Sequence, residues 1–166
     1  IYIYYLKNII MKKNLTLGVF LLLFQFATSQ SSAIKGNPLG LVVGNTNIGY
    51  EFSTKDSQSI TISGLYFNIL NIEGVGAGLE YRFYFDKEAI TGWHAGPTMG
   101  YFKLEDKFDV SRSVFNIGAE IGHQWIFGEH FLLDVFGSYG FNSGGDDLSG
   151  FNTSSGTGGL SLGYAW

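Results

Sequence analysis

The sequence alternates large apolar residues with glycine or small polar residues, and this period of two constrains the fold most. The last segment shows the pattern clearly. One face of an extended strand would carry Leu160, Leu162, Tyr164 and Trp166, and the other Thr157, Gly159, Ser161, Gly163 and Ala165. Successive side chains of a strand point to opposite faces, so this strand is apolar on one side only. The pattern is typical of a strand with lipid on one side and a crowded lumen on the other.

Four earlier segments follow the same rule, at residues 75–85, 93–101, 115–127 and 131–141. If their large faces pointed inward, the outer faces would be strings of glycine, which stabilise an exposed strand poorly. Glycine inside a narrow barrel relieves crowding instead. We therefore expect the bulky apolar side chains to point outward, toward lipid.

The composition agrees with this interpretation, because 24 glycines and 28 aromatic residues suit a β-barrel better than a helical domain. We predict an all-β protein, a closed antiparallel transmembrane barrel. Seven strands are clear, and bacterial barrels of this kind have even strand numbers, so we expect eight. The opening stretch is divided into strands at 34–43 and 47–53, with a tight turn at 44–46. One long strand with a bulge is the alternative.

The connections differ in length, which predicts an orientation. Short polar segments at 54–58, 86–89 and 128–130 are expected to be periplasmic turns, and longer segments at 105–113 and 142–156 to be outer loops. Pro97 has no N–H to donate within a sheet, so we expect it to mark a bulge.

The N-terminal part is predicted to be a leader. Met11 begins a short basic segment, residues 15–26 are apolar, and Ala27 and Ser29 suit a cleavage site. We expect residues 1–10 to be an upstream translation artefact, 11–29 a cleaved signal peptide and 30–166 the outer-membrane barrel domain. That domain holds all 14 acidic residues but seven of the ten basic ones, a formal net charge of −7. Such a charge makes nucleic acid an unsuitable partner.

Three groups of candidate functional residues follow from the pattern. The inward face collects a lumen charge network, which consists of Glu51, Glu80, Arg82, Glu120 and Asp134. Aromatic residues near strand ends are expected to form an interfacial girdle, made of Tyr81, Trp93, Tyr101, Trp125 and Tyr139. The C-terminal strand is expected to be the assembly signal, through Leu160, Leu162, Tyr164 and Trp166.

A narrow eight-stranded interior is filled by side chains, so the favoured role of the charge network is to pack a polar lumen. The alternative is a narrow ion-permeable pore, gated by Arg82 as it switches between carboxylates.

Several motifs resemble one family. They are Asn37-Pro38-Leu39-Gly40-Leu41, Gly49-Tyr50-Glu51, Gly78-Leu79-Glu80-Tyr81-Arg82-Phe83-Tyr84-Phe85 and Gly118-Ala119-Glu120-Ile121-Gly122. With them the chain resembles small outer-membrane barrels of Gram-negative, Bacteroidetes-type bacteria, which are catalogued as a domain of unknown function or as OmpA/OmpX-like barrels. The resemblance implies an outer-membrane location and supplies no catalytic residues.

The remaining alternatives are a rim-active lipid-modifying enzyme and a soluble lipocalin-like binder. Barrel enzymes use histidine with serine or a carboxylate, and here His94 shares its phase with Ser138, whereas His123 falls on the lipid face and His130 in a turn. Asp146 and Asp147 lack the ordered ligands of a calcium loop. We therefore expect a non-enzymatic monomer with a structural, envelope-integrity or surface-interaction role, without cofactor, metal or catalytic residue. Its expected partners are membrane lipid and, during insertion, the barrel-assembly machinery and periplasmic chaperones.

Overall fold

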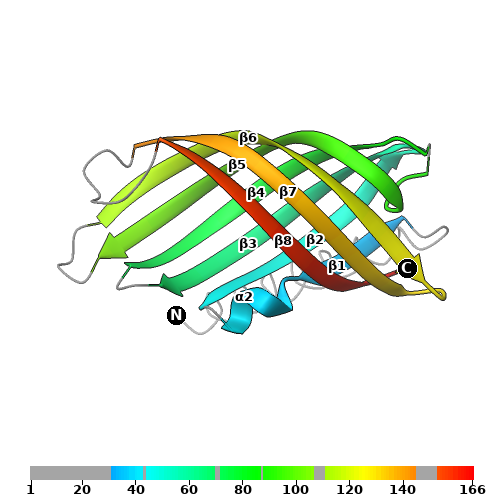
Figure 1. Cartoon of the computed structure of the whole chain (residues 1–166), viewed down its shortest axis with the longest axis horizontal. Helices are drawn as coiled ribbons and strands as arrows, with labels where there is room; N and C mark the ends of the chain where they lie inside the picture. The colour runs from blue at the N-terminus through cyan, green and yellow to red at the C-terminus, as the bar shows by residue number, and fades with distance from the viewer. Residues whose placement is uncertain (1–30, 43, 70–71, 87, 107–110, 145–152) are drawn as a thin grey trace, which may run out of the picture.

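The chain folds into a closed antiparallel barrel in which each strand pairs with the next and β1 pairs with β8 (Figure 1). This computed structural model describes residues 31–42, 44–69, 72–86, 88–106, 111–144 and 153–166. The strands are β1 (Ser32–Gly36), β2 (Asn45–Lys55), β3 (Gln58–Ile69), β4 (Ile72–Tyr84), β5 (Gly92–Asp106), β6 (Ser111–Phe127), β7 (Phe131–Ser143) and β8 (Ser154–Ala165). The predicted all-β barrel of eight strands is confirmed.

The proposed leader and the upstream segment, residues 1–29, lie outside the described residues. In the part of the chain that the structure describes, no helix is both long and apolar enough to span a membrane.

The opening stretch differs from the prediction of a strand at 34–43. β1 ends at Gly36, and a short helix, α2 (Pro38–Val42), follows it. The helix begins here because Asn37 Oδ1 accepts the N–H of Gly40 at 3.0 Å, and Pro38 occupies a first-turn position that needs no N–H. The predicted turn was also misplaced, because β2 already begins at Asn45. Two strands nonetheless precede β3, as the even count required.

The two faces of the barrel wall are divided as the alternation predicted. Large apolar side chains on the outside are exposed, among them Val75, Phe83, Met99, Ile117, Ile121, Val135, Phe141, Leu162 and Tyr164. Inside, the buried side chains are mainly polar or charged. The barrel is therefore an inside-out structure, with apolar residues outside and polar residues inside.

Pro97 does not produce the predicted bulge. The pairing of β4 with β5 has the same register on both sides of it, from Glu80↔Thr98 to Phe83↔Ala95. Gly96 allows β4 and β5 to approach closely at this point, because any larger side chain there would collide with the backbone of Tyr81. A register shift occurs instead between Ser53 and Lys55 of β2.

The three connections predicted to be short lie together at one end of the barrel, which we call the turn end. They join β2 to β3 after Lys55, β4 to β5 and β6 to β7. Length alone does not separate the two ends, since β3 ends at Ile69 and β4 begins at Ile72 at the other end, whereas residues 85–91 lie between β4 and β5. At the other end, the loop end, the strands extend further than predicted, since β5 continues to Asp106 and β8 begins at Ser154. Polar contacts hold these extensions, such as Tyr101 Oη to Ser113 Oγ at 2.8 Å.

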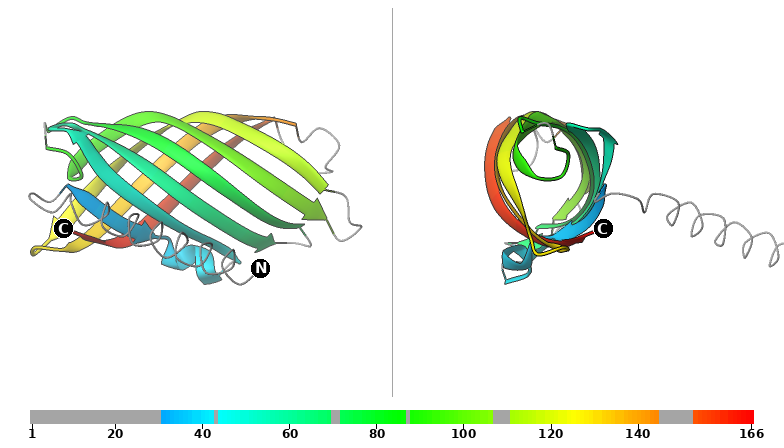
Figure 2. Two further views of the ribbon diagram at one scale, coloured as in Figure 1. Left: turned by 180° about the vertical axis from the view of Figure 1, so that it is seen from behind. Right: turned by 90° about the vertical axis from the view of Figure 1, so that its right-hand side faces the viewer.

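The connection between β4 and β5 folds back into the turn end of the barrel (Figure 2, right). Ile90 is only 1% exposed and packs with Ala33, Leu132 and Ala165. Its backbone has a positive φ of 64°, which is strained for a β-branched residue, and Gln124 Nε2 donates to its carbonyl at 2.6 Å. This small apolar cluster closes the turn end beneath the polar interior.

Candidate functional site

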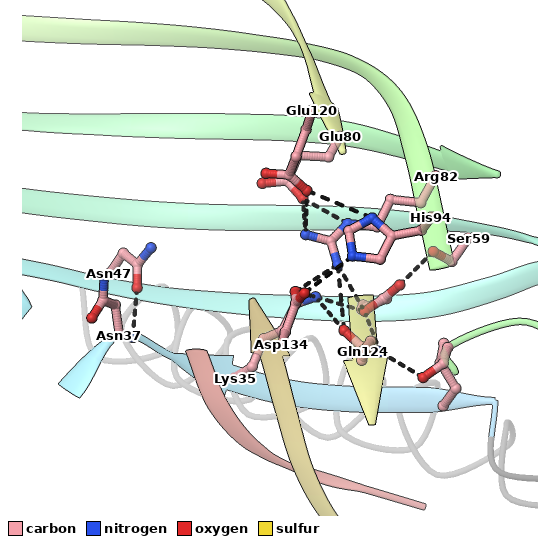
Figure 3. Close-up of polar contacts among 12 residues, drawn as sticks. Lys35, Asn37, Asn47, Ser59, Glu80, Arg82, His94, Glu120, Gln124 and Asp134 are labelled. Carbon is pink, nitrogen blue, oxygen red and sulfur yellow. Dashed lines mark hydrogen bonds and ion pairs between the residues drawn. The ribbon is translucent and has the colours of Figure 1, made fainter. Parts of the chain in front are cut away.

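The structure brings the five residues of the lumen charge network together near the turn end (Figure 3). Further side chains join them from neighbouring strands: Lys35 of β1, Ser59 of β3, Tyr84 of β4, His94 of β5 and Gln124 of β6. Seven of the eight strands thus contribute, because the inward phase of each reaches the same level of the narrow lumen.

Arg82 lies at the centre of the lumen charge network and is 2% exposed. Its Nη2 donates to Glu80 and to Glu120, each at 2.7 Å, and its Nε donates to Glu80 at 3.0 Å. Its Nη1 donates to Asp134 at 2.8 Å and to Gln124 Oε1 at 3.3 Å. The guanidinium has five N–H donors, and all of them are engaged.

Lys35 is the second buried cation and is 6% exposed. Its Nζ donates to Glu51 at 2.7 Å, to Asp134 at 3.0 Å and to Gln124 Oε1 at 3.0 Å. The sequence pattern did not indicate that Lys35 faces the lumen, because β1 has only five residues before the chain turns into α2, too few for alternation to assign a face. The sequence did contain one signal: Lys35 is a single cation with small or apolar residues on both sides.

Glu51 connects the charges to the closed turn end. Ser59 Oγ and Tyr84 Oη each donate to its Oε1 at 2.5 Å. Its Oε2 accepts from Gln124 Nε2 at 3.2 Å as well as from Lys35. Since Gln124 also holds the carbonyl of Ile90, the ion pairs and the apolar cluster below them are one connected unit.

His94 is fully buried within the same network. Its Nε2 lies 3.0 Å from Asp134 Oδ1, and its Nδ1 lies 3.9 Å from Glu120 Oε1. Within the described residues, no hydrogen bond joins His94 to Ser138, the serine that shares its phase, which lines a cavity instead. The described residues also contain no group of three or more histidine or acidic side chains arranged to hold a metal ion.

The other two histidines lie elsewhere. The ring of His123 packs on the outer face between Trp93 and Trp125, with centroid distances of 5.0 and 4.2 Å. His130 lies in the β6–β7 turn, where its Nδ1 is 2.8 Å from the carbonyl of Ala165.

The aromatic residues expected in the girdle lie on the outer face at two levels. Trp93 and Trp125 are exposed near the turn end, where the ring of Tyr81 lies 4.8 Å from that of Phe83. Tyr101 and Tyr139 are exposed nearer the loop end.

The C-terminal strand closes the barrel. β8 pairs with β1 between residues 33–36 and 162–165, and the carbonyl of Trp166 accepts the N–H groups of Ser31 and Ser32. Leu162 and Tyr164 are exposed on the outer face, whereas Leu160 and Trp166 are partly buried. The ring of Trp166 lies 6.1 Å from that of Tyr50 on β2.

A cavity of about 490 Å³ lies between the lumen charge network and the loop end. Glu80 and Glu120 line it and belong to the network, so their carboxylates form its floor. Its walls combine aromatic and aliphatic side chains with small polar ones, including Leu65, Phe67, Phe102, Leu104, Phe136, Asn47, Ser63, Thr98, Asn116, Ser138, Ser155 and Thr157.

Comparison with known proteins places the chain by family. No protein in a curated collection matches it significantly. The sequence model of one family matches residues 15–155, which include most of the barrel. The chain therefore belongs to the family described as Protein of unknown function (DUF3575).

Proposed function

We propose that the protein is a non-enzymatic, integral outer-membrane β-barrel of a Gram-negative, Bacteroidetes-type bacterium, with a structural, envelope-integrity or surface-interaction role. The observation that carries the proposal is the inside-out distribution of side chains. Exposed apolar residues occupy the outer face of the strands, and charged residues are buried inside. Water would penalise such an outer face, whereas lipid matches it.

Two further features support this location. The exposed aromatic residues lie near both ends of the strands, as interfacial residues of membrane barrels do. The closed barrel also satisfies its backbone internally over most of its circumference, which a hydrocarbon environment requires. We infer that the turn end faces the periplasm, because the longest connection, between Ser143 of β7 and Ser154 of β8, lies at the other end, and membrane barrels have their longer loops outside the cell.

The alternatives fit the geometry less well. A soluble lipocalin-like binder needs its apolar faces inside the barrel, and here they lie outside. A narrow pore needs a continuous path, which the ion pairs and Ile90 block at the turn end. Conductance of a planar bilayer that vanishes on Arg82→Ala would favour the pore.

Cell fractionation tests the proposal. We expect the protein in the outer-membrane fraction, with a gel mobility that changes on heating because the folded barrel resists detergent. Recovery of the protein in the soluble periplasmic fraction would refute the membrane assignment. For the rim-enzyme alternative, lipid A with altered acylation that depends on His94 would replace the non-enzymatic role.

A further inference from the structure

One part of the barrel wall is not closed by strand pairing. β1 ends at Gly36, which pairs with Leu162, but β8 continues to Ser154. Within the described residues, the 154–161 part of β8 has no strand partner on that edge, although β7 pairs with it on the other. Figure 1 looks onto this side, with β8 at the front and α2 below it. We call the stretch of wall between this unpaired edge of β8 and α2, two elements that also contact each other, the lateral gap.

The two sides of the lateral gap differ. On the β2 side, Asn47 Oδ1 accepts the N–H of Asn37 at 2.8 Å, and Gly40 packs against the carbonyl of Asn45, so α2 covers that edge. On the β8 side, the pattern of antiparallel pairing directs the backbone groups of even-numbered residues into the lateral gap, because Trp166 exchanges both its N–H and C=O bonds with Ser32. The residues concerned are Ser154, Gly156, Gly158 and Leu160. This edge is polar, and α2 also contacts β8.

The lateral gap and the cavity are adjacent. Asn47 of β2 lines the cavity on one side of the lateral gap, and Ser155 and Thr157 of β8 line it on the other. Ser155 and Thr157 are both exposed, although both have the inward phase. The cavity therefore reaches the part of the wall that strand pairing does not close.

Among the described residues that line the cavity, the floor offers hydrogen-bond acceptors and no lysine or arginine donor. Arg82 directs all five donors to groups with which it is already paired. Within the described residues, one oxygen of each floor carboxylate takes part in these ion pairs, Oε2 of Glu80 and Oε1 of Glu120. The network contains four carboxylates against Lys35 and Arg82, so it is formally short of positive charge. The floor is matched to a protonated amine and repels an anion.

The side chains of the cavity walls indicate the chemistry of the remaining part of a ligand. Phe102, Phe136 and Leu104 line the cavity and suit an apolar body. Outside, the exposed side chains of Leu39, Leu41 and Val42 on α2 provide an apolar surface beside the lateral gap.

From this arrangement we propose that the cavity binds an amphiphile with a protonated amine head and an apolar tail. The ammonium group lies against Glu80 and Glu120, and the tail leaves the barrel through the lateral gap into the membrane. The exit into lipid rests on the proposed outer-membrane location, whereas the head-group site does not.

The experiment uses the full barrel in nanodiscs of zwitterionic lipid and four probes: octylammonium, octanol, octanoate and propylammonium. Because the chain has no cysteine, Gly158→Cys carries a single environment-sensitive fluorophore at the lateral gap. A side chain fits there, since a Cβ at this position would lie 3.6 Å from its nearest neighbour, the carbonyl oxygen of Phe136. We expect saturable binding of octylammonium by calorimetry, about tenfold or more tighter than of octanol and octanoate, with a shift of the label emission. Propylammonium has no tail to fill the lateral gap and is expected to bind more weakly without shifting the label.

Glu80→Gln and Glu120→Gln should each weaken octylammonium binding about tenfold. Glu73→Gln is the matched control, because Glu73 is exposed on the same strand and contacts Tyr66 outside the cavity. Heat-modifiable mobility of every variant establishes that it has folded. Equal binding of octylammonium and octanol, or unchanged binding by Glu80→Gln, would overturn the head-group site. A label that does not respond to bound octylammonium would overturn the lateral exit.

Failure here is distinguishable from failure of the proposed function. A protein that fractionates with the outer membrane but does not prefer the amine refutes this site alone. A protein found in the soluble fraction refutes the membrane location, whatever its binding.

Discussion

At the scale of single residues, Arg82 is the side chain on which the stability of the folded barrel's polar interior most depends. It is buried among carboxylates from β4, β6 and β7, and each of its donors has a partner. A buried ion pair contributes little net stability by itself, but loss of one partner leaves charges that neither water nor a counterion compensates. The guanidinium is therefore needed even if the network as a whole serves only to pack the lumen.

Arg82→Ala should lower the free energy of unfolding by about 3–5 kcal/mol, because buried Glu120 and Asp134 and half-buried Glu80 lose their common partner. Arg82→Lys should lose less, since it keeps the charge but not the five donors. Equilibrium unfolding in urea, followed by tryptophan fluorescence, measures the difference. Lys103→Ala, at an exposed position, is the control and should change little. An equal effect of the two alanine variants would contradict the central role of Arg82.

How much of the site was predictable depends on the residue. Alternation alone placed Glu80, Arg82 and Glu120 on the inner face, because they lie in long strands with a strict period of two. It did not reveal that Lys35 joins them, since β1 is short and is followed by a helix. Nor did it pair His94 with Asp134, because pairing requires the register between strands that are distant in sequence.

At the scale of elements, glycines set how closely neighbouring strands approach. At Gly96 a side chain would collide with the backbone of Tyr81 on β4, which cannot move without breaking the sheet. At Gly64 of β3 no atom lies within 4 Å of the position a Cβ would take. The two glycines thus have different structural roles: Gly96 shares the inward phase of buried His94, whereas Gly64 shares the outward phase of exposed Ile62 and Tyr66.

Gly96→Ala should destabilise the barrel by about 1–3 kcal/mol, the usual cost of overpacking. Gly64→Ala is the matched control and should be neutral or slightly stabilising, because glycine weakens a strand interior. Urea midpoints of the two variants compare them directly. A larger loss of stability for Gly64→Ala than for Gly96→Ala would contradict the close approach of β4 and β5.

The C-terminal strand is the element on which closure depends. β1 meets β8 only between residues 33–36 and 162–165, with further backbone bonds from Trp166. Removal of residues 164–166 takes away most of this contact and the terminal aromatic pair.

The truncated chain should therefore fail to assemble, with no heat-modifiable band in the outer-membrane fraction. Tyr139→Ala removes an exposed aromatic residue far from the closing seam and should assemble normally. Normal insertion of the truncated chain would count heavily against closure through β8.

At the scale of the whole molecule, the fold was more predictable than its details. The all-β class and the even strand number follow from a period-two pattern repeated along the chain, and the structure has both. α2 was not predicted, because five residues are too few to show a helical period and its start depends on one side-chain hydrogen bond from Asn37. The fold of the β4–β5 connection into the lumen was missed as well, since a polar connecting segment gives no sign that Ile90 is buried.

The central claim, that the apolar outer face contacts lipid, is tested most directly by spin labels on β6 in vesicles. Single cysteines at Asn116, Ile117 and Ile121 probe the lumen and two exposed outer positions, and Lys55→Cys provides an exposed reference at a turn. We predict that labels at Ile117 and Ile121 collide with oxygen and are shielded from a water-soluble nickel complex, whereas the label at Asn116 shows the opposite preference. Collision of the nickel complex with Ile117 and Ile121 at the level seen for Lys55 would contradict the account.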